Sequence, residues 1–128
     1  MQGYSEQTMA HFEQPQNVGR LPDADGLGAR GDPTCGDFLQ VWIKVCADHI
    51  SDIRFQCRGC PAAIATASIM TELAKGKTLA QAEQITPEDL CLAAGGLPPG
   101  KEHCSNLAAQ ALQQAISHYR TGGKHTSP

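Results

Sequence analysis

Residues 37–74 decide the fold, and they read DFLQVWIKVCADHISDIRFQCRGCPAAIATASIMTELA. The first part alternates apolar and polar residues, with the apolar positions at Leu39, Val41, Ile43 and Val45. This period of two is typical of a strand with one buried face. After an expected turn at 47–49, the alternation resumes from about Ile50 with Ile53, Phe55 and Cys57. The two runs predict an antiparallel hairpin.

The pattern changes to that of a helix after Cys60. Pro61 suits a first helical turn and Gly76 suits a helix end, and the residues between them are mostly alanine and other apolar types. The beginning of this segment is apolar on all sides, so we expect a helix that is buried there.

Further helices are expected on both sides of this central stretch. Ser5 suits the cap of a short first helix, and Thr78 with Gln81 forms a capping-box pattern. The expected helices cover residues 5–11, 78–85, 86–95 and 102–122. Residues 17–37 are rich in Gly, Pro and Asp, which predicts turns with one edge strand. Strands followed by helices favour an α+β fold, in which helices cover one face of a small antiparallel sheet.

Length and charge exclude several classes of protein. The chain has 128 residues, with 10 Lys and Arg against 13 Asp and Glu, and its formal net charge is −3. One domain over 1–128 is expected, with a loose tail from about residue 122. The weak negative charge argues against nucleic acid and anionic membranes as partners, since both require clustered cations. The sequence starts without a signal-peptide pattern and has no membrane-length apolar run, so we expect a cytoplasmic protein.

The six cysteines are the most informative feature of the composition. In a reducing cytoplasm they are not expected to form a disulfide framework. Cys35, Cys60 and Cys104 each lie where an expected helix or strand begins or ends. Cys60 and Cys104 are also expected at helix N-termini, where the helix dipole favours thiolate over thiol.

These three cysteines could supply three sulfur ligands. They are 25 and 44 residues apart, so only a fold that gathers strand ends and helix starts would bring them together. Asp37 and His103 are the alternatives for a fourth ligand, and the sequence does not decide between them. Soft thiolates suit zinc, Cu(I) or an iron-sulfur cluster, and suit magnesium or calcium poorly.

The other cysteines and histidines have simpler interpretations. Cys46 and Cys91 are expected to pack in the core, because free cysteine is among the most buried residue types. Cys57 is three residues before Cys60, the spacing of a zinc knuckle or redox pair, but the lack of a second such pair favours a strand residue. Solvated surface positions are expected for His11, His49, His118 and His125.

At these residues the sequence resembles the IscU/NifU-type iron-sulfur cluster assembly scaffolds. The resemblance covers most of the chain, and the order and spacing of its short motifs make it specific. The matching stretches are Tyr4-Ser5, 11–19, Cys35-Gly36-Asp37, Gly59-Cys60, 63–65, Thr71-Glu72, 76–78, 97–99, Lys101 and 103–105.

The resemblance implies a SufE/NifU-like sandwich and a non-enzymatic scaffold. On such a scaffold a [2Fe-2S] cluster is built from iron and persulfide sulfur and then passed to apo iron-sulfur proteins. Cys35, Cys60 and Cys104 match the family's ligands for the cluster or for a surrogate zinc, with Asp37 and His103 beside them. Cys104 also matches the usual persulfide acceptor from a pyridoxal-phosphate cysteine desulfurase of the NifS/IscS type, and Lys101 matches a lysine next to the site.

The sequence departs from the family pattern at positions that bear on its partners and on its branch of the family. An Hsp70-type chaperone and its co-chaperone are further implied partners through residues 97–101, where Gly100 replaces the family's valine. Cys57 and Arg58 also replace residues that are usually of other types. The chain lacks the insertion found in SufU-type proteins and has the histidine that those proteins lack, which favours the IscU-like branch. The sequence does not decide whether the protein forms a homodimer or a higher oligomer.

Two alternative functions use the same residues. One is a zinc-bound sulfur-acceptor protein that stimulates a desulfurase without holding a cluster. The other is a thiol enzyme in which His103 activates a cysteine; it is disfavoured because adjacent helical residues point about 100° apart.

Overall fold

Three antiparallel strands form a sheet in the order β1-β2-β3 in the computed structural model, which describes residues 3–31 and 36–122. The strands are β1 (Gly26–Gly31), β2 (Phe38–Cys46) and β3 (His49–Arg58). β1 is the edge strand expected between residues 17 and 37, and β2 and β3 are the expected hairpin. The predicted α+β fold is therefore confirmed.

The hairpin turn is tighter than expected. Ala47 and Asp48 connect the strands with φ of +51° and +66°, and His49 already belongs to β3. Positive φ at both central residues is the mark of a type I′ turn, whose twist matches that of the flanking strands.

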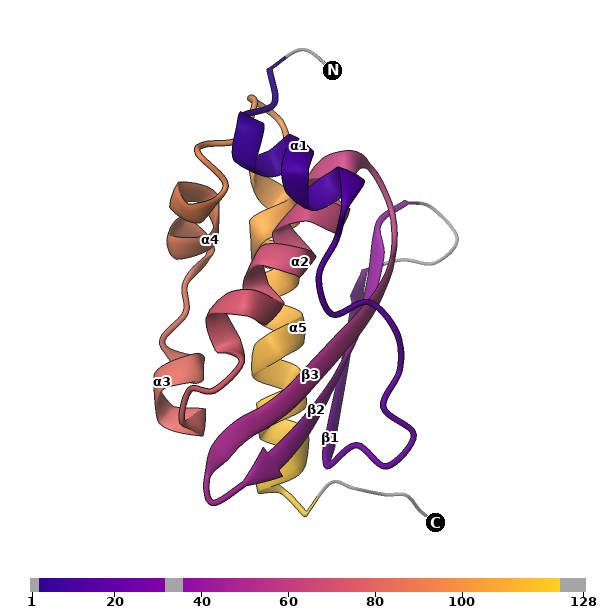
Figure 1. Cartoon of the computed structure of the whole chain (residues 1–128), viewed down its shortest axis with the longest axis vertical. Coiled ribbons are helices and arrows are strands. Elements are labelled where there is room, and N and C mark those ends of the chain that lie inside the picture. The colour runs from indigo at the N-terminus through magenta and orange to yellow at the C-terminus, as the bar shows by residue number, and fades with distance from the viewer. Residues whose placement is uncertain (1–2, 32–35, 123–128) are drawn as a thin grey trace.

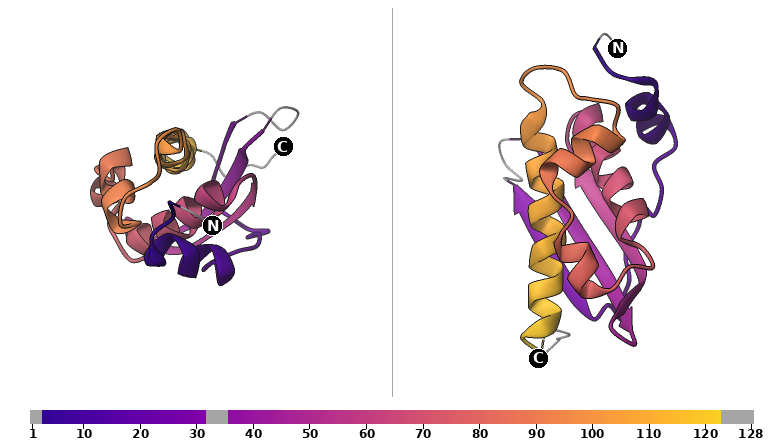
Figure 2. Two further views of the ribbon diagram at one scale, coloured as in Figure 1. Left: turned by 90° about the horizontal axis from the view of Figure 1, so that it is seen from above. Right: turned by 90° about the vertical axis from the view of Figure 1, so that its left-hand side faces the viewer.

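Five helices lie on one side of the sheet, and they form two further layers (Figures 1 and 2). Their bounds are α1 Glu6–Glu13, α2 Pro61–Ala74, α3 Leu79–Glu83, α4 Pro87–Ala93 and α5 Glu102–Arg120. α2 and α5 cover the sheet, α3 and α4 lie beyond them, and α1 packs against α2. Capping boxes begin both α3 and α4, the first of them as Thr78 and Gln81 predict, although each helix ends about two residues earlier than expected.

The inner face of the sheet supplies much of the core. Leu39, Val41 and Ile43 of β2 are fully buried beside Ile53 and Phe55 of β3. They pack against apolar residues of α2 and α5, so the alternation in the sequence marks the buried face correctly.

Two glycines in β1 let α5 approach the sheet closely. A Cβ atom on Gly28 would lie 2.2 Å from the carbonyl oxygen of Ala111, and one on Gly26 would lie 2.3 Å from that of Ala115. Both distances are far below van der Waals contact, so larger residues at these two positions would push the helix away.

Polar side chains of α5 also cover the free edge of β1. The Ala29 N–H donates to Gln114 Oε1 at 2.7 Å, and the Leu27 N–H donates to His118 Nδ1 at 3.0 Å. The half-buried His118 therefore accepts a hydrogen bond from the edge of the sheet in addition to its expected exposure to solvent. Bonds of this kind occupy edge N–H groups that could otherwise pair with another strand.

His11 was likewise expected at a solvated surface and instead joins α1 to α2. Its Nδ1 lies 2.7 Å from the hydroxyl of Ser68, which also accepts the Gln16 N–H at 2.8 Å, and its Nε2 lies 3.5 Å from Glu72. The expectation fails because the partners of His11 are more than 50 residues away in sequence.

The two cysteines expected in the core do not lie there. Cys46 is exposed at the hairpin end, and Cys91 is half-buried on α4. Cys46 shares its alternation with Gln40 and Lys44, so the strand period already places it on the outward face.

Within residues 3–31 and 36–122, none of the helices combines the length and the apolar character needed to cross a bilayer.

Replacing Gly28 with alanine is expected to lower the free energy of unfolding by roughly 1–3 kcal/mol, because the added methyl group collides with the backbone of α5. Urea denaturation followed by circular dichroism measures the change. Gly36→Ala is the matched control, since a Cβ there meets nothing within 4 Å. Equal stability of the two variants would contradict the close packing of α5 on β1.

Candidate functional site

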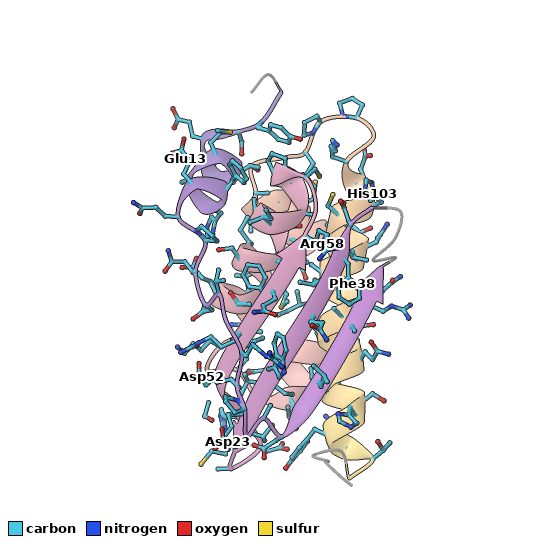
Figure 3. All side chains as sticks on the ribbon, turned by 90° about the vertical axis from the view of Figure 1, so that its right-hand side faces the viewer. Glu13, Asp23, Phe38, Asp52, Arg58 and His103 are labelled. Atoms are coloured by element: carbon cyan, nitrogen blue, oxygen red, sulfur yellow. The ribbon has the colours of Figure 1, made fainter. Side chains whose placement is uncertain are left out.

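Four of the five sequence-predicted site residues meet at one end of the sheet. Asp37 precedes β2, Cys60 precedes α2, and His103 and Cys104 lie in the first turn of α5. Figure 3 shows the neighbouring Phe38, Arg58 and His103 at this same end, far from Asp23 and Asp52. The fifth predicted residue, Cys35, lies outside the described residues.

The Asp37 carboxylate occupies the centre of the group. Its Oδ1 accepts the Cys60 N–H at 3.3 Å, and its Oδ2 lies 3.8 Å from Cys60 Sγ, 3.6 Å from Cys104 Sγ and 3.3 Å from His103 Nε2. One oxygen thus binds the start of α2 while the other faces the potential ligands.

Gly59 makes this placement of Asp37 sterically allowed. A Cβ at Gly59 would lie 2.5 Å from Asp37 Oδ1, so any other residue would displace the carboxylate. This role of Gly59 is not among the expectations from the sequence, although a glycine directly before a predicted ligand at a strand end is a usable signal for it.

The two thiols lie at helix N-termini, as expected. Cys60 is the N-cap residue of α2, Cys104 is the third residue of α5, and their sulfur atoms are 3.8 Å apart. Cys104 is almost completely buried, whereas Cys60 is partly exposed.

His103 is the most exposed member of the group, with 59% of its side-chain surface accessible. Its Nε2 lies 3.6 Å from the sulfur of Cys104. Adjacent helical residues rarely meet, but here the His103 imidazole lies over the open first turn and comes close to Cys104. His103 Nδ1 makes a separate contact of 3.2 Å with the carbonyl oxygen of Gly100.

The distances among Asp37, His103 and Cys104 match those between three ligands of a tetrahedral zinc ion, and Cys60 Sγ lies 3.8 Å from Asp37 Oδ2 and from Cys104 Sγ but outside this mutually close group. Typical zinc bond lengths place two sulfur ligands about 3.8 Å apart, sulfur and nitrogen or oxygen about 3.6 Å apart, and nitrogen and oxygen about 3.4 Å apart. The measured separations are 3.8 Å between the sulfurs, 3.6 Å from Cys104 Sγ to both His103 and Asp37, and 3.3 Å between His103 and Asp37. The ligand atoms of Asp37, His103 and Cys104 all lie within 4.8 Å of one another. The donor set therefore fits a thiophilic metal.

The charge state of Cys104 differs from the sequence-based expectation. Burial raises the pKa of the Cys104 thiol well above its ordinary value, and the negative charges of Cys60 and Asp37 raise it further. These effects outweigh the helix dipole, so the neutral thiol is favoured in the absence of a cation. The pKa of Lys101 is also raised, chiefly by the negative charge of Cys60, as expected for a cation that stabilises a nearby thiolate.

Cys57 lies next to the group without belonging to it. It pairs with Leu39 across the hairpin, is half-buried, and packs against the apolar residues beneath the site. Burial, followed by the charges of Asp37 and Cys60, raises the pKa of its thiol to about 12. Its surroundings agree with the interpretation as a strand residue.

The chain belongs to the family of NifU-like N-terminal domains, whose model matches residues 3–126. This match spans nearly the whole sequence and includes all five predicted site residues. The resemblance inferred from short motifs is therefore confirmed at the level of the family.

Curated relatives carry consistent names. The chain is 52% identical to the iron-sulfur cluster assembly scaffold protein IscU 1 of Archaeoglobus fulgidus, over 94% of this chain and 80% of the relative. It is 43% identical to the protein named IscU in Escherichia coli K12, over 92% of this chain and 94% of the relative.

The fold is shared with solved structures. One is a scaffold protein for the SUF system from Fervidobacterium islandicum, with a TM-score of 0.72 and 23% identity, covering 88% of this chain and 96% of that chain. At this identity the likeness concerns the fold alone.

Zinc binding is expected to tighten as pH rises, because the raised pKa of Cys104 means that the metal must displace a proton. For each proton displaced, the association constant should increase about tenfold per pH unit. Titration calorimetry in buffers of different ionisation enthalpy measures both the constant and the number of protons. Cys104→Ser should reduce that number by about one, whereas Cys91→Ser should leave it unchanged. A pH-independent affinity would contradict the assignment of Cys104 as a ligand.

Proposed function

We propose that this protein is a scaffold on which a [2Fe-2S] cluster is assembled and from which it passes to apo-proteins. Iron and persulfide sulfur are the substrates, and a cysteine desulfurase supplies the sulfur. The proposed ligands are Cys35, Cys60 and Cys104, with Asp37 and His103 as the alternatives for the fourth position.

The observation that carries the proposal is the convergence of two thiols, a carboxylate and an imidazole. They come from three separate segments, and the donor atoms of Asp37, His103 and Cys104 are spaced as metal ligands are. The family match and the names of the relatives support cluster assembly as the use of this donor set.

A mixed set of thiolate, carboxylate and imidazole ligands suits a cluster that must be transferred to another protein. Stable ferredoxin-type clusters are held by four thiolates, whereas a carboxylate or imidazole is a harder and more exchangeable ligand. His103 is largely exposed to solvent, so a recipient's thiols could replace it first.

Sulfur delivery is proposed to occur at Cys104. Its thiolate attacks the terminal sulfur of the desulfurase persulfide, the S–S bond breaks, and the desulfurase cysteine leaves as a thiolate. Cys104 then carries the persulfide, with no net oxidation or reduction. Because Cys104 is only 1% exposed, the donor must displace neighbouring side chains, and Lys101 would stabilise the attacking anion.

The role proposed is that of a carrier and not of a turnover catalyst. A cytoplasmic location and recognition of residues 97–101 by an Hsp70-type chaperone and its co-chaperone belong to the same proposal. In the described part of the chain, five cysteines are free thiols, as a reducing compartment would keep them.

The zinc-bound sulfur acceptor is the less favoured alternative, since the relatives at 43–52% identity are named as assembly scaffolds. Metal analysis of protein from iron-replete, zinc-poor medium distinguishes the two. Tightly retained zinc with stimulated desulfurase turnover and no chromophore would establish the alternative.

Anaerobic incubation with ferrous iron, cysteine and a desulfurase is expected to produce the visible absorption and circular dichroism of a [2Fe-2S] cluster. Cys60→Ser and Cys104→Ser should each lower its yield more than about tenfold, since even supporting residues of metal sites contribute that much. Cys35→Ser is expected to act in the same way.

Cys46→Ser is the matched control, because Cys46 is exposed at the opposite end of the hairpin. Its cluster yield should equal that of the unmodified protein. Well-folded protein that forms no chromophore, or equal yields from all four variants, would refute the proposal.

A further inference from the structure

The outward face of the sheet has no helical layer over it. The five helices lie on the other side (Figure 2), and the strands turn every second side chain toward this face. Even so, the face carries apolar side chains, because Leu27 of β1 is 39% exposed and Val18, which lies beside β3, is 53% exposed. These are two of the three large hydrophobic residues that are exposed within residues 3–31 and 36–122.

A groove of about 400 Å³ opens on this face at the end nearest the candidate site. The described residues that line it are Val18, Phe38, Gln40, Gln56, Cys57 and Arg58. Phe38 and Arg58 form the outermost pair of β2 and β3, and Figure 3 shows both near His103. A molecule in the groove would therefore lie next to the site.

Two arginines beside the groove carry charge that the described part of the chain leaves unpaired. Arg58 and Arg20 are both exposed, and none of the ion pairs among the described residues includes either of them. The Arg20 guanidinium instead lies 5.8 Å from the centroid of the Trp42 ring, in a cation–π contact. Such a contact leaves the positive charge available to a carboxylate.

The remaining charges on this half of the sheet do not cancel that excess. Arg54 pairs with Asp52, but the same Asp52 oxygen also lies 3.5 Å from Lys75 Nζ, so two cations share one carboxylate. None of the described residues that line the groove is acidic. Asp37, next to Phe38 in sequence, turns its carboxylate toward the candidate site instead. The surroundings of the groove are therefore positive, in a chain whose formal net charge is −3.

These charges decide between the classes of molecule that could cover the face. A two-fold pair of copies of this chain would bring the same patch of each copy together, and like charges across an interface oppose association. Nucleic acid also fits poorly, because a few arginines among apolar and amide side chains supply too little cation for a row of phosphates. A polypeptide with carboxylates around an apolar side chain complements both features of the groove.

We propose that this groove docks an acidic polypeptide segment of a partner protein. An apolar side chain of the segment fills the space next to Val18 and Phe38, and carboxylates near it pair with Arg58 and Arg20. Exposed charge pairs of this kind contribute more to specificity and to the rate of encounter than to affinity, which suits a partner that arrives and leaves. The inference goes beyond the proposed function and does not depend on it, because docking requires neither iron nor sulfur.

The fluorescence of Trp42, the one tryptophan of the chain, reports on this face because Arg20 lies over its ring. The probe is a short synthetic peptide with a central leucine between glutamate and aspartate residues, and its counterpart carries glutamine and asparagine instead. We expect the acidic peptide to change the emission saturably at low salt and to bind about fivefold or more tightly than the amide peptide. Added salt should weaken its binding, since it screens exposed charge pairs.

Arg58→Glu should weaken binding of the acidic peptide about fivefold or more, because the reversed charge replaces attraction with repulsion. Lys77→Glu is the matched control, since it changes the net charge equally at an exposed residue near the other end of β3, where the Lys77 carbonyl oxygen accepts the Ile50 N–H. Val18→Ser should weaken binding roughly threefold through the loss of apolar contact. Leu92→Ser, which removes an exposed apolar side chain from α4, should leave binding unchanged.

The proposal is overturned if the acidic peptide does not bind saturably, if the amide peptide binds equally well, or if Arg58→Glu and Lys77→Glu have equal effects. It is also overturned if single-stranded oligothymidylate binds more tightly than the acidic peptide at the same salt concentration, or if sedimentation shows a dimer that Val18→Ser no longer forms. If Arg58→Glu does not fold, Arg58→Gln takes its place with the same direction of change. A protein that docks the peptide but assembles no cluster would refute the proposed function and leave this inference standing.

Discussion

The register of β2 against β3 fixes the position of the groups at the site. Phe38 and Arg58 form the outermost pair, so Asp37 and Gly59 lie just beyond it, and the next residue, Cys60, is the N-cap of α2. Slipping the register by one residue would turn the inward side chains outward and separate Asp37 from the Cys60 N–H. Because that slip would expose the buried apolar face, the hydrophobic core of the hairpin also maintains the geometry of the polar site.

The local features of the fold could be predicted because they are encoded by neighbouring residues. The alternation around Val41 marks the inner face of β2, and the capping box that begins at Thr78 marks the start of α3. The site followed from a similar rule, since Cys60 and Cys104 were chosen as cysteines at element ends. The fold does gather those ends, as the sequence pattern required.

The missed features all depend on contacts between residues far apart in the sequence. The place of Gly59 before a predicted ligand hints at a close approach but does not show that Asp37 will lie where its Cβ would be, and nothing near His11 indicates Ser68. The protonated state of Cys104 was missed for the same reason. A helix N-terminus is visible in the sequence, whereas the burial and neighbouring charges that outweigh it arise only when three segments meet.

The Asp37 carboxylate and the two cysteine sulfurs lie close together at the site, and a bound cation would reduce the repulsion between their negative charges. Asp37 Oδ2 lies 3.8 Å from Cys60 Sγ, 3.6 Å from Cys104 Sγ and 3.3 Å from His103 Nε2, so four potential metal donors lie close together. Without a cation, protons must occupy some of these donor atoms. Burial and the negative charge of Cys60 raise the pKa of the Cys104 thiol, so Cys104 keeps its proton. A bound metal exchanges those protons for stronger bonds, and protons can in turn compete with it. Binding and release of a metal are then two directions of one exchange with protons.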